Sequence, residues 1–289
     1  MLPTFRADKL VGIHTEVEFR NSIKNLDQVS GTEITDLDSF LNAVKQRHDF
    51  FHEQGCRLSD LGMSSIDWID FTVQEVQSSF KKLIRDQNLS DTDKSKLCSF
   101  ILLELGKMNR EKGWVQQFHL GPIRNNNSRF LEAIGTDTGF DSIGDLPQAK
   151  GLSEFLDALD YNNQLAKTVL YNVNPSQNEV FATMAGNFND GTVKGKVQWG
   201  SAWWFLDQLD GMEKQINTLS NVGLLSCFVG MLTDSRSFMS FPRHEYFRRL
   251  LCNILGKDVE KGHLPNDIPL LSKLVTDVSY TNAKNYFNF

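Results

Sequence analysis

The segment Val115–Asn127, VQQFHLGPIRNNN, concentrates side chains that suit a small anionic molecule. An apolar–polar run of strand character ends in His119, and the chain then breaks at Gly121–Pro122 into a loop with Arg124 and consecutive asparagines. An imidazole can transfer a proton near neutral pH, and a guanidinium can bind a carboxylate through paired hydrogen bonds. Two plainer interpretations stay open: His119 can be a packed, hydrogen-bonded side chain, and the asparagines can cap the next helix.

A second pair of candidates follows the apolar run Phe228–Leu232. Asp234 and Arg236 are two positions apart, so in extended backbone their side chains point the same way. Asp234 can bind a metal or accept a proton, and Arg236 can hold a carboxylate. The alternatives are a local ion pair, or an aspartate that caps the next helix.

Paired tryptophans, Trp203 and Trp204, end the segment Lys196–Phe205. Adjacent residues of a strand face opposite ways, so no more than one of them needs to line a pocket. Arg6 follows the short run Leu2–Phe5 and is a further cation at a predicted strand end.

These candidates need a scaffold that gathers strand ends, and the pattern of the chain predicts one. Strand-like runs alternate with amphipathic helical ones, which is typical of an α/β fold with a parallel sheet. The predicted strands are Leu2–Phe5, Cys56–Leu58, Trp114–Leu120, Thr168–Val173, Val197–Trp199 and Phe228–Leu232. The predicted helices are Asp36–Gln54, Ser90–Glu111, Glu179–Phe188, Met212–Asn221, Arg243–Glu260 and Asp267–Tyr286.

Each predicted strand runs into a residue of a functional type: Arg6, Asp60, His119, Asn174, Trp203 and Asp234. Such residues meet at the carboxyl ends of the strands of a (β/α)8 barrel. A doubly wound sheet is the alternative, but neither a GxGxxG nor a GxxxxGK[ST] loop occurs. We therefore predict a barrel, with residues 1–289 as a single domain of about six βα units instead of eight.

Composition excludes several classes of function. The net charge of −6 with no basic block argues against a nucleic-acid partner. The longest apolar stretch, Val222–Leu232, is too short to span a bilayer, and the N-terminus has no signal-peptide layout. The histidines show no HxH or HExxH spacing, so no metal site can be assembled by motif. The cysteines form no CxxC pair and are expected to be buried free thiols in the cytoplasm; they are Cys56, Cys98, Cys227 and Cys252.

Six long motifs together resemble the uronate isomerase (glucuronate isomerase) family, an outlying branch of the amidohydrolase superfamily. They are LPTFRADK at 2–9, HEQGCRLSD at 52–60, GWVQQFHLGPIRNNN at 113–127, GFDSIGD at 139–145, QWGSAWWF at 198–205 and GLLSCFVGMLTDSRSFMSFPRHEYFRR at 223–249. The resemblance covers essentially the whole chain. It implies a distorted (β/α)8 TIM-type barrel and the isomerisation of D-glucuronate to D-fructuronate, and of D-galacturonate to D-tagaturonate, in bacterial uronate catabolism.

The resemblance also implies roles for individual residues. Asp234 matches a metal-linked aspartate at the end of the last strand, and it is expected to act in catalysis with Arg236 and His119. Substrate binding is expected from arginines and tryptophans, namely Arg6, Arg124, Trp203 and Trp204. The implied cofactor is one divalent metal, often zinc.

Two departures from the family pattern modify these expectations. The chain begins where the family's third strand begins, so the first two strands and an H-x-H pair of metal ligands are missing. Leu61 stands where a histidine is expected. We therefore expect an incomplete barrel whose metal is weakly bound or absent, with the missing N-terminal segment or a second copy of the chain as a partner. The alternatives are a non-catalytic fragment, or a metal-dependent hydrolase of the same superfamily.

Overall fold

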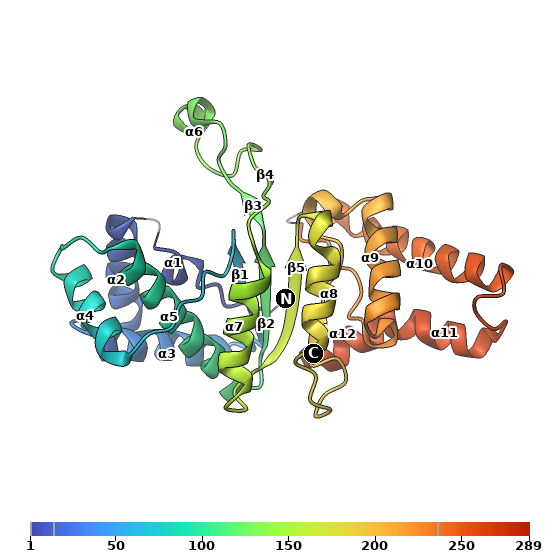
Figure 1. The fold of residues 1–289 in the computed structure, drawn as a ribbon, viewed down its shortest axis with the longest axis horizontal. Coiled ribbons are helices and arrows are strands. Elements are labelled where there is room, and N and C mark those ends of the chain that lie inside the picture. The colour runs from blue at the N-terminus through green and yellow to red at the C-terminus, as the bar shows by residue number, and fades with distance from the viewer. Residues whose placement is uncertain (1, 14, 236) are drawn as a thin grey trace. The chain divides into compact units, whose positions relative to one another are not determined.

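The computed structural model describes residues 2–13, 15–235 and 237–289 (Figure 1). The chain divides into two compact units, Met1–Phe118 with Pro147–Thr168, and His119–Leu146 with Val169–Phe289. Four strands form one parallel sheet in the order β1-β2-β5-β6, and the division between the units falls within β2 and β5. Their bounds are β1 Leu58–Met63, β2 Val115–Leu120, β5 Lys167–Asn172 and β6 Val197–Trp199. The predicted α/β class with a parallel sheet is confirmed.

Four of the six helices described in the first unit, α2, α3, α4 and α5, begin after a residue whose side chain caps the helix. Asp36 accepts a hydrogen bond from the backbone N–H of Ser39, and Ser90 accepts one from that of Asp93. These bonds satisfy backbone donors that a helix start leaves without a partner. The helices are α1 Asp8–Val11, α2 Glu16–Ser30, α3 Leu37–Glu53, α4 Val73–Ile84, α5 Asp91–Glu111 and α7 Ala149–Asp160.

The second unit ends in a run of helices, and one prediction for this run is corrected. Asp267–Tyr286 is not one regular helix, because a π-helical turn at Asp277–Thr281 interrupts it. The helices of this unit are α6 Ser128–Ile134, α8 Asn178–Gly186, α9 Leu209–Val222, α10 Pro242–Glu260, α11 Ile268–Thr276 and α12 Asn282–Phe287. No helix in the described part of the chain is long and apolar enough to cross a bilayer.

The predicted first strand, Leu2–Phe5, is wrong as a strand. Only Phe5 pairs, through an isolated parallel bridge to Ser59. The Phe5 N–H donates to the Leu58 carbonyl, and the Asp60 N–H donates to the Phe5 carbonyl. Pro3 has no N–H to extend this ladder.

The predicted last strand, Phe228–Leu232, is also wrong. Gly230 has a φ of +80°, which lies outside the β region. The Val229 N–H donates to the side-chain oxygen of Gln198, and the Gln198 amide donates in turn to the Cys227 carbonyl. A side chain of β6 thus satisfies backbone groups that a neighbouring strand would otherwise pair with. The predicted six strand units are therefore four strands and one bridge.

A short hairpin that the sequence did not indicate follows β2. Its strands, β3 Pro122–Ile123 and β4 Ser142–Ile143, pair antiparallel. Helix α6 lies beyond this hairpin and has no buried residue among its seven (Figure 1). We call residues 121–146 the arm.

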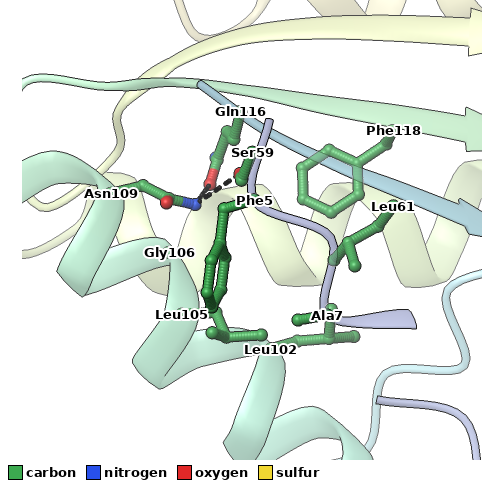
Figure 2. A pocket seen from close by; sticks show the side chains of 10 residues that line it. All are labelled: Phe5, Ala7, Ser59, Leu61, Leu102, Leu105, Gly106, Asn109, Gln116 and Phe118. Atoms are coloured by element: carbon green, nitrogen blue, oxygen red, sulfur yellow. Dashed lines mark hydrogen bonds between the residues drawn. The ribbon is translucent and has the colours of Figure 1, made fainter. Parts of the chain in front are cut away.

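A buried polar network lies within the core of the first unit (Figure 2). The Asn109 amide of α5 donates to the hydroxyl of Ser59 and to the side-chain oxygen of Gln116, and its own oxygen lies 3.1 Å from His48 Nε2. The Gln116 amide donates to Thr168 Oγ1. These contacts join α3, α5 and three strands through side chains alone.

All four cysteines are free, but only Cys56 is buried. Cys252 is exposed, so the expectation that every thiol is buried is wrong. Its position on α10 leaves the side chain on the outer face of that helix, because the buried residues there are Phe247, Leu250, Leu251 and Leu255.

Candidate functional site

His119 lies at the end of β2 and is buried, with 6% of its surface exposed. Its ring stacks on Tyr171 of β5, with centroids 4.3 Å apart and planes 4° apart. The edge of Trp203 approaches the same imidazole at 4.6 Å. Gly121 follows with a φ of +110°, and a Cβ there would lie 3.1 Å from Val173. The sharp turn after His119 therefore requires glycine.

Trp203 joins His119 to the predicted catalytic carboxylate. Its indole N–H donates to Asp234 Oδ2 at 2.7 Å, and its side chain is buried. Trp204 packs against Trp203 at 5.6 Å and is 36% exposed. The structure therefore brings together three elements that are far apart in the sequence: the end of β2, the segment after β6 and the loop that holds Asp234.

Three residues of this cluster and of the arm have a left-handed backbone conformation. Trp204 has a φ of 52° and Asp234 a φ of 45°, and Asn125 in the arm has a φ of 56°. Residues with side chains rarely adopt this left-handed region, and a bulky tryptophan least of all. Each such residue costs about 1–3 kcal/mol and is typical of functional sites.

The arm contributes Arg124 to the same cluster. Its guanidinium carbon lies 5.1 Å from the centroid of the Trp204 ring. Arg124 Nη1 donates to Asp141 Oδ2 at 3.2 Å, and the other Asp141 oxygen accepts from the backbone N–H of Asn125 at 2.8 Å. The predicted residues His119, Arg124, Trp203, Trp204 and Asp234 thus form a continuous set of contacts.

Arg6 belongs to the first unit and is held there by two carboxylates. Its Nε and Nη2 atoms donate to the two oxygens of Asp8, and Nη1 donates to Asp60 of β1. Burial would raise the pKa of Asp8, but the hydrogen bonds from Arg6 and from the Gly62 N–H outweigh it, so the pKa is lowered. Arg6 is therefore part of a charged cluster at the start of α1.

Other predicted strand-end residues have structural contacts or lie outside the described residues. The Asn174 amide donates to the Gly144 carbonyl, and its oxygen caps the next turn at Ser176. Leu61, which stands where a histidine was expected, is buried beside Leu102 and Phe118 in the first unit (Figure 2). Arg236 lies outside the described residues.

The described residues do not make a metal site by themselves. No group of three or more His, Cys, Asp or Glu side chains that could hold a metal occurs among residues 2–13, 15–235 and 237–289. Protein zinc sites supply three or four ligands. Asp234, the predicted ligand, already accepts a hydrogen bond from Trp203. One carboxylate and one nearby imidazole thus fall short of the donor set that zinc requires.

Two cavities formed by described residues lie away from this cluster. The cavity beneath the Asn109 network has a volume of about 10 Å³, which is room for about one water molecule (Figure 2). A wider groove of about 670 Å³ lies along α11 and α12 in the second unit, and none of the predicted site residues lines it.

Sequence reasoning missed the side chains that hold the site residues. They are Tyr171 under His119, Asp141 on Arg124 and Asp8 on Arg6. Asp8 was readable from its position two residues after Arg6. Asp141 and Tyr171 carry no such local signal, since their partners are 17 and 52 positions away.

The fold and the cluster define a class of protein: an incomplete (β/α)8 barrel whose candidate site follows the carboxyl ends of parallel strands. The chain belongs to the glucuronate isomerase family, whose family model matches residues 1–287. The resemblance in the motifs is thereby confirmed.

Uronate isomerases of several bacteria are similar to this chain in sequence and structure. The uronate isomerase of Bacteroides thetaiotaomicron is 53% identical over 290 residues, and that of Flavobacterium johnsoniae is 54% identical over 289. The match covers 100% of this chain but 62% of each relative, so the chain spans less than two thirds of their length. The crystal structure of uronate isomerase from Thermotoga maritima matches 99% of this chain and 61% of its own, with a TM-score of 0.91 and 33% identity. That of glucuronate isomerase from Caulobacter crescentus, at 24% identity and a TM-score of 0.88, supports the fold.

Proposed function

We propose that this chain carries part of the active site of an enzyme that isomerises uronates, D-glucuronate to D-fructuronate and D-galacturonate to D-tagaturonate. The observation that supports it best is the contact of His119, Trp203 and Asp234 in a chain of this family. The relatives named above are uronate isomerases, and none of them favours the alternative, a metal-dependent hydrolase.

The reaction requires proton transfer between neighbouring carbons through an enediolate, so it needs a base, an acid and a stabilised oxyanion. Asp234 and His119 are the proton carriers that we propose, and Trp203 orients the Asp234 carboxylate through its N–H. Arg236 is proposed to stabilise negative charge, and Trp204, Arg124 and Arg6 are the proposed substrate contacts. The stacked Tyr171 holds the imidazole plane and limits its contact with water.

The family resemblance implies a divalent metal, with zinc as the first choice. Because the described residues do not complete a metal site, the roles proposed here belong to the chain's own side chains. A metal would need ligands from another segment or another chain.

Organisation and location are part of the same proposal. We propose that residues 1–289 belong to one barrel domain that is completed by a further segment or by a second copy of the chain. A cytoplasmic location also stays a prediction.

The test is turnover by the 289-residue chain, alone and mixed with the remaining segment of the Bacteroides thetaiotaomicron relative. We expect no conversion of D-glucuronate by the chain alone and measurable D-fructuronate in the mixture, followed by nuclear magnetic resonance. Asp234→Asn in the mixture should lower kcat by at least about a hundredfold, since proton transfer by a positioned group contributes roughly 10²–10⁴.

A matched variant separates the loss of chemistry from the loss of folding. Asp258→Asn removes a half-buried carboxylate of α10, which contacts His263 and none of the proposed site residues that the structure describes, and it should leave turnover unchanged. A mixture that assembles into a complex, as shown by size-exclusion chromatography, and yet converts no uronate would contradict the proposal and favour a non-catalytic fragment.

A further inference from the structure

Arg6 and Arg124, the two arginines proposed as substrate contacts, differ in which edge of the guanidinium group already donates hydrogen bonds. Arg6 uses Nε and Nη2 together on Asp8, at 3.1 and 3.0 Å. This edge presents two parallel N–H groups and is the one that grips a carboxylate side-on. In Arg6 that edge is therefore filled from within the chain.

Arg124 has the same edge open. Its hydrogen bond to Asp141 and its longer 3.8 Å contact with Asp137 both use Nη1. Within residues 2–13, 15–235 and 237–289, Nε and Nη2 of Arg124 donate to no protein atom. The side chain is 43% exposed, so a ligand can reach it.

Asp141 is built to hold this guanidinium in place. Its side chain is 9% exposed, and its second oxygen accepts from the N–H of Asn125, the residue in the left-handed conformation. The turn is fixed further by Asn126, whose amide donates to the carbonyls of Ile123 and Phe140. One carboxylate thus fixes both the backbone turn and the charged group that the turn carries.

We propose that Asp141 is a positioning residue that holds Arg124 with its Nε–Nη2 edge open for the carboxylate of a sugar acid. Arg6 is then a structural cation of the first unit rather than the carboxylate contact. The inference rests on the proposed function for the class of ligand, but it concerns binding and not turnover.

Two carboxylates near Arg124 are expected to affect anion binding differently. Arg124 faces two aspartates, and their combined charge disfavours a further anion. Asp137 is 75% exposed and lies 3.8 Å away, so it is screened by water and salt and contributes little to holding the guanidinium. Removing Asp141 should weaken the binding of an anion, because the guanidinium is then no longer held in place and this loss exceeds the relief of charge repulsion. Removing Asp137 should leave the binding unchanged or strengthen it.

The experiment is calorimetric titration of the 289-residue chain with D-glucuronate and with D-glucose, which lacks the carboxylate. Tryptophan fluorescence, recorded in parallel, sums the signals of five tryptophans, of which Trp204 lies beside Arg124. We expect D-glucuronate to bind more tightly than D-glucose. Asp141→Asn and Arg124→Lys should each raise the Kd for D-glucuronate about tenfold, with little change for D-glucose.

Controls are available at matched positions. Asp141→Glu keeps the charge and should restore part of the affinity. Asp137→Asn should keep the preference for the uronate. Thermal unfolding of each variant shows whether the arm and its unit remain folded.

Three results would overturn the inference: no binding of D-glucuronate by the unmodified chain, unchanged affinity in Asp141→Asn, or an equal loss in Asp137→Asn. The proposed function fails in a different way. Selective uronate binding without turnover in the completed mixture counts against the isomerase and leaves the role of Asp141 standing.

Discussion

At the scale of single residues, each candidate functional group in the second unit is held by a neighbour. Trp203 bonds to Asp234, Tyr171 stacks under His119, and Asp141 holds Arg124. A group that is held before the substrate arrives loses less conformational freedom on binding. Substitution of these neighbours is therefore expected to weaken the site without removing a reacting atom.

His48 in the first unit shows what burial does to a group outside the site. It is 1% exposed and stacks on Trp114 at 3.8 Å. Burial lowers the pKa of His48 to about 4, although the hydrogen bond to Asn109 opposes the shift. Because Asn109 presents its oxygen to Nε2, the neutral ring carries its proton on that nitrogen.

The depressed pKa of His48 predicts a loss of stability in acid. The neutral ring is favoured in the fold, so its contribution is fully present above the unfolded pKa of about 6.5 and is lost as the pH falls toward 4. Between pH 7 and pH 4 this histidine should lower the free energy of unfolding by about 3 kcal/mol.

The measurement is urea unfolding across that range for the unmodified chain and for His48→Gln. The glutamine can donate to Asn109 but does not titrate. Between pH 7 and pH 4 the free energy of unfolding of the variant should therefore fall by about 3 kcal/mol less than that of the unmodified chain. Parallel curves for the two proteins would show that His48 is not the titrating group.

At the scale of elements, the ends of β5 and β6 are fitted closely to each other. A Cβ at Gly200 would lie 2.2 Å from the ring of Tyr171, the ring that stacks on His119. The Gly200 N–H also donates to the Leu170 carbonyl, so the backbone cannot move away without losing a sheet hydrogen bond. The glycine after β6 therefore controls where the ring on β5 lies.

Gly200→Ala should displace Tyr171 and with it the support of His119. We expect a loss of about 1–3 kcal/mol in unfolding free energy, as for other overpacked sites. Near-ultraviolet circular dichroism should change as the ring moves. Gly186→Ala, in α8 with open space around its Cβ, is the matched control and should be neutral or stabilising. Equal stability of the two variants would refute the close fit.

At the scale of the whole molecule, the chain covers 62% of the length of its relatives, and its described residues assemble no cluster of three metal ligands. A carboxylate and an imidazole alone bind zinc weakly, because they fill two of its four coordination positions and water fills the others. The family is shown by the match of its model to residues 1–287. The activity and the metal of this polypeptide remain proposals.

We accordingly expect the purified chain to hold little metal. Elemental analysis after dialysis should find well below one equivalent of zinc per chain. Addition of the remaining segment of a relative should raise that value, and Asp234→Asn should lower it again. A full equivalent retained by the chain alone would show a site that includes residues outside those described here.

The sequence by itself determined the family, the α/β class and several helices, namely α3, α5, α8, α9 and α10, but it did not indicate α1, α2, α4, α6 or α7. Asp36 caps the start of helix α3 and Ser90 caps the start of α5, so both helices begin at the next residue. Such features are predictable because a helix forms its hydrogen bonds within four residues and its caps within three.

Tertiary structure decided which strand-like runs became strands and which charged groups were already paired within the chain. Phe228–Leu232 has the composition of a strand, but the side chain of Gln198, about 30 positions earlier, takes up its backbone groups. Arg6 and Arg124 look alike in sequence, and only their partners, Asp8 with Asp60 and Asp141, distinguish a filled edge from an open one. Sheet pairing and ion pairing depend on residues that are distant in sequence. Local patterns could therefore identify candidate strands and candidate site residues, but not their partners.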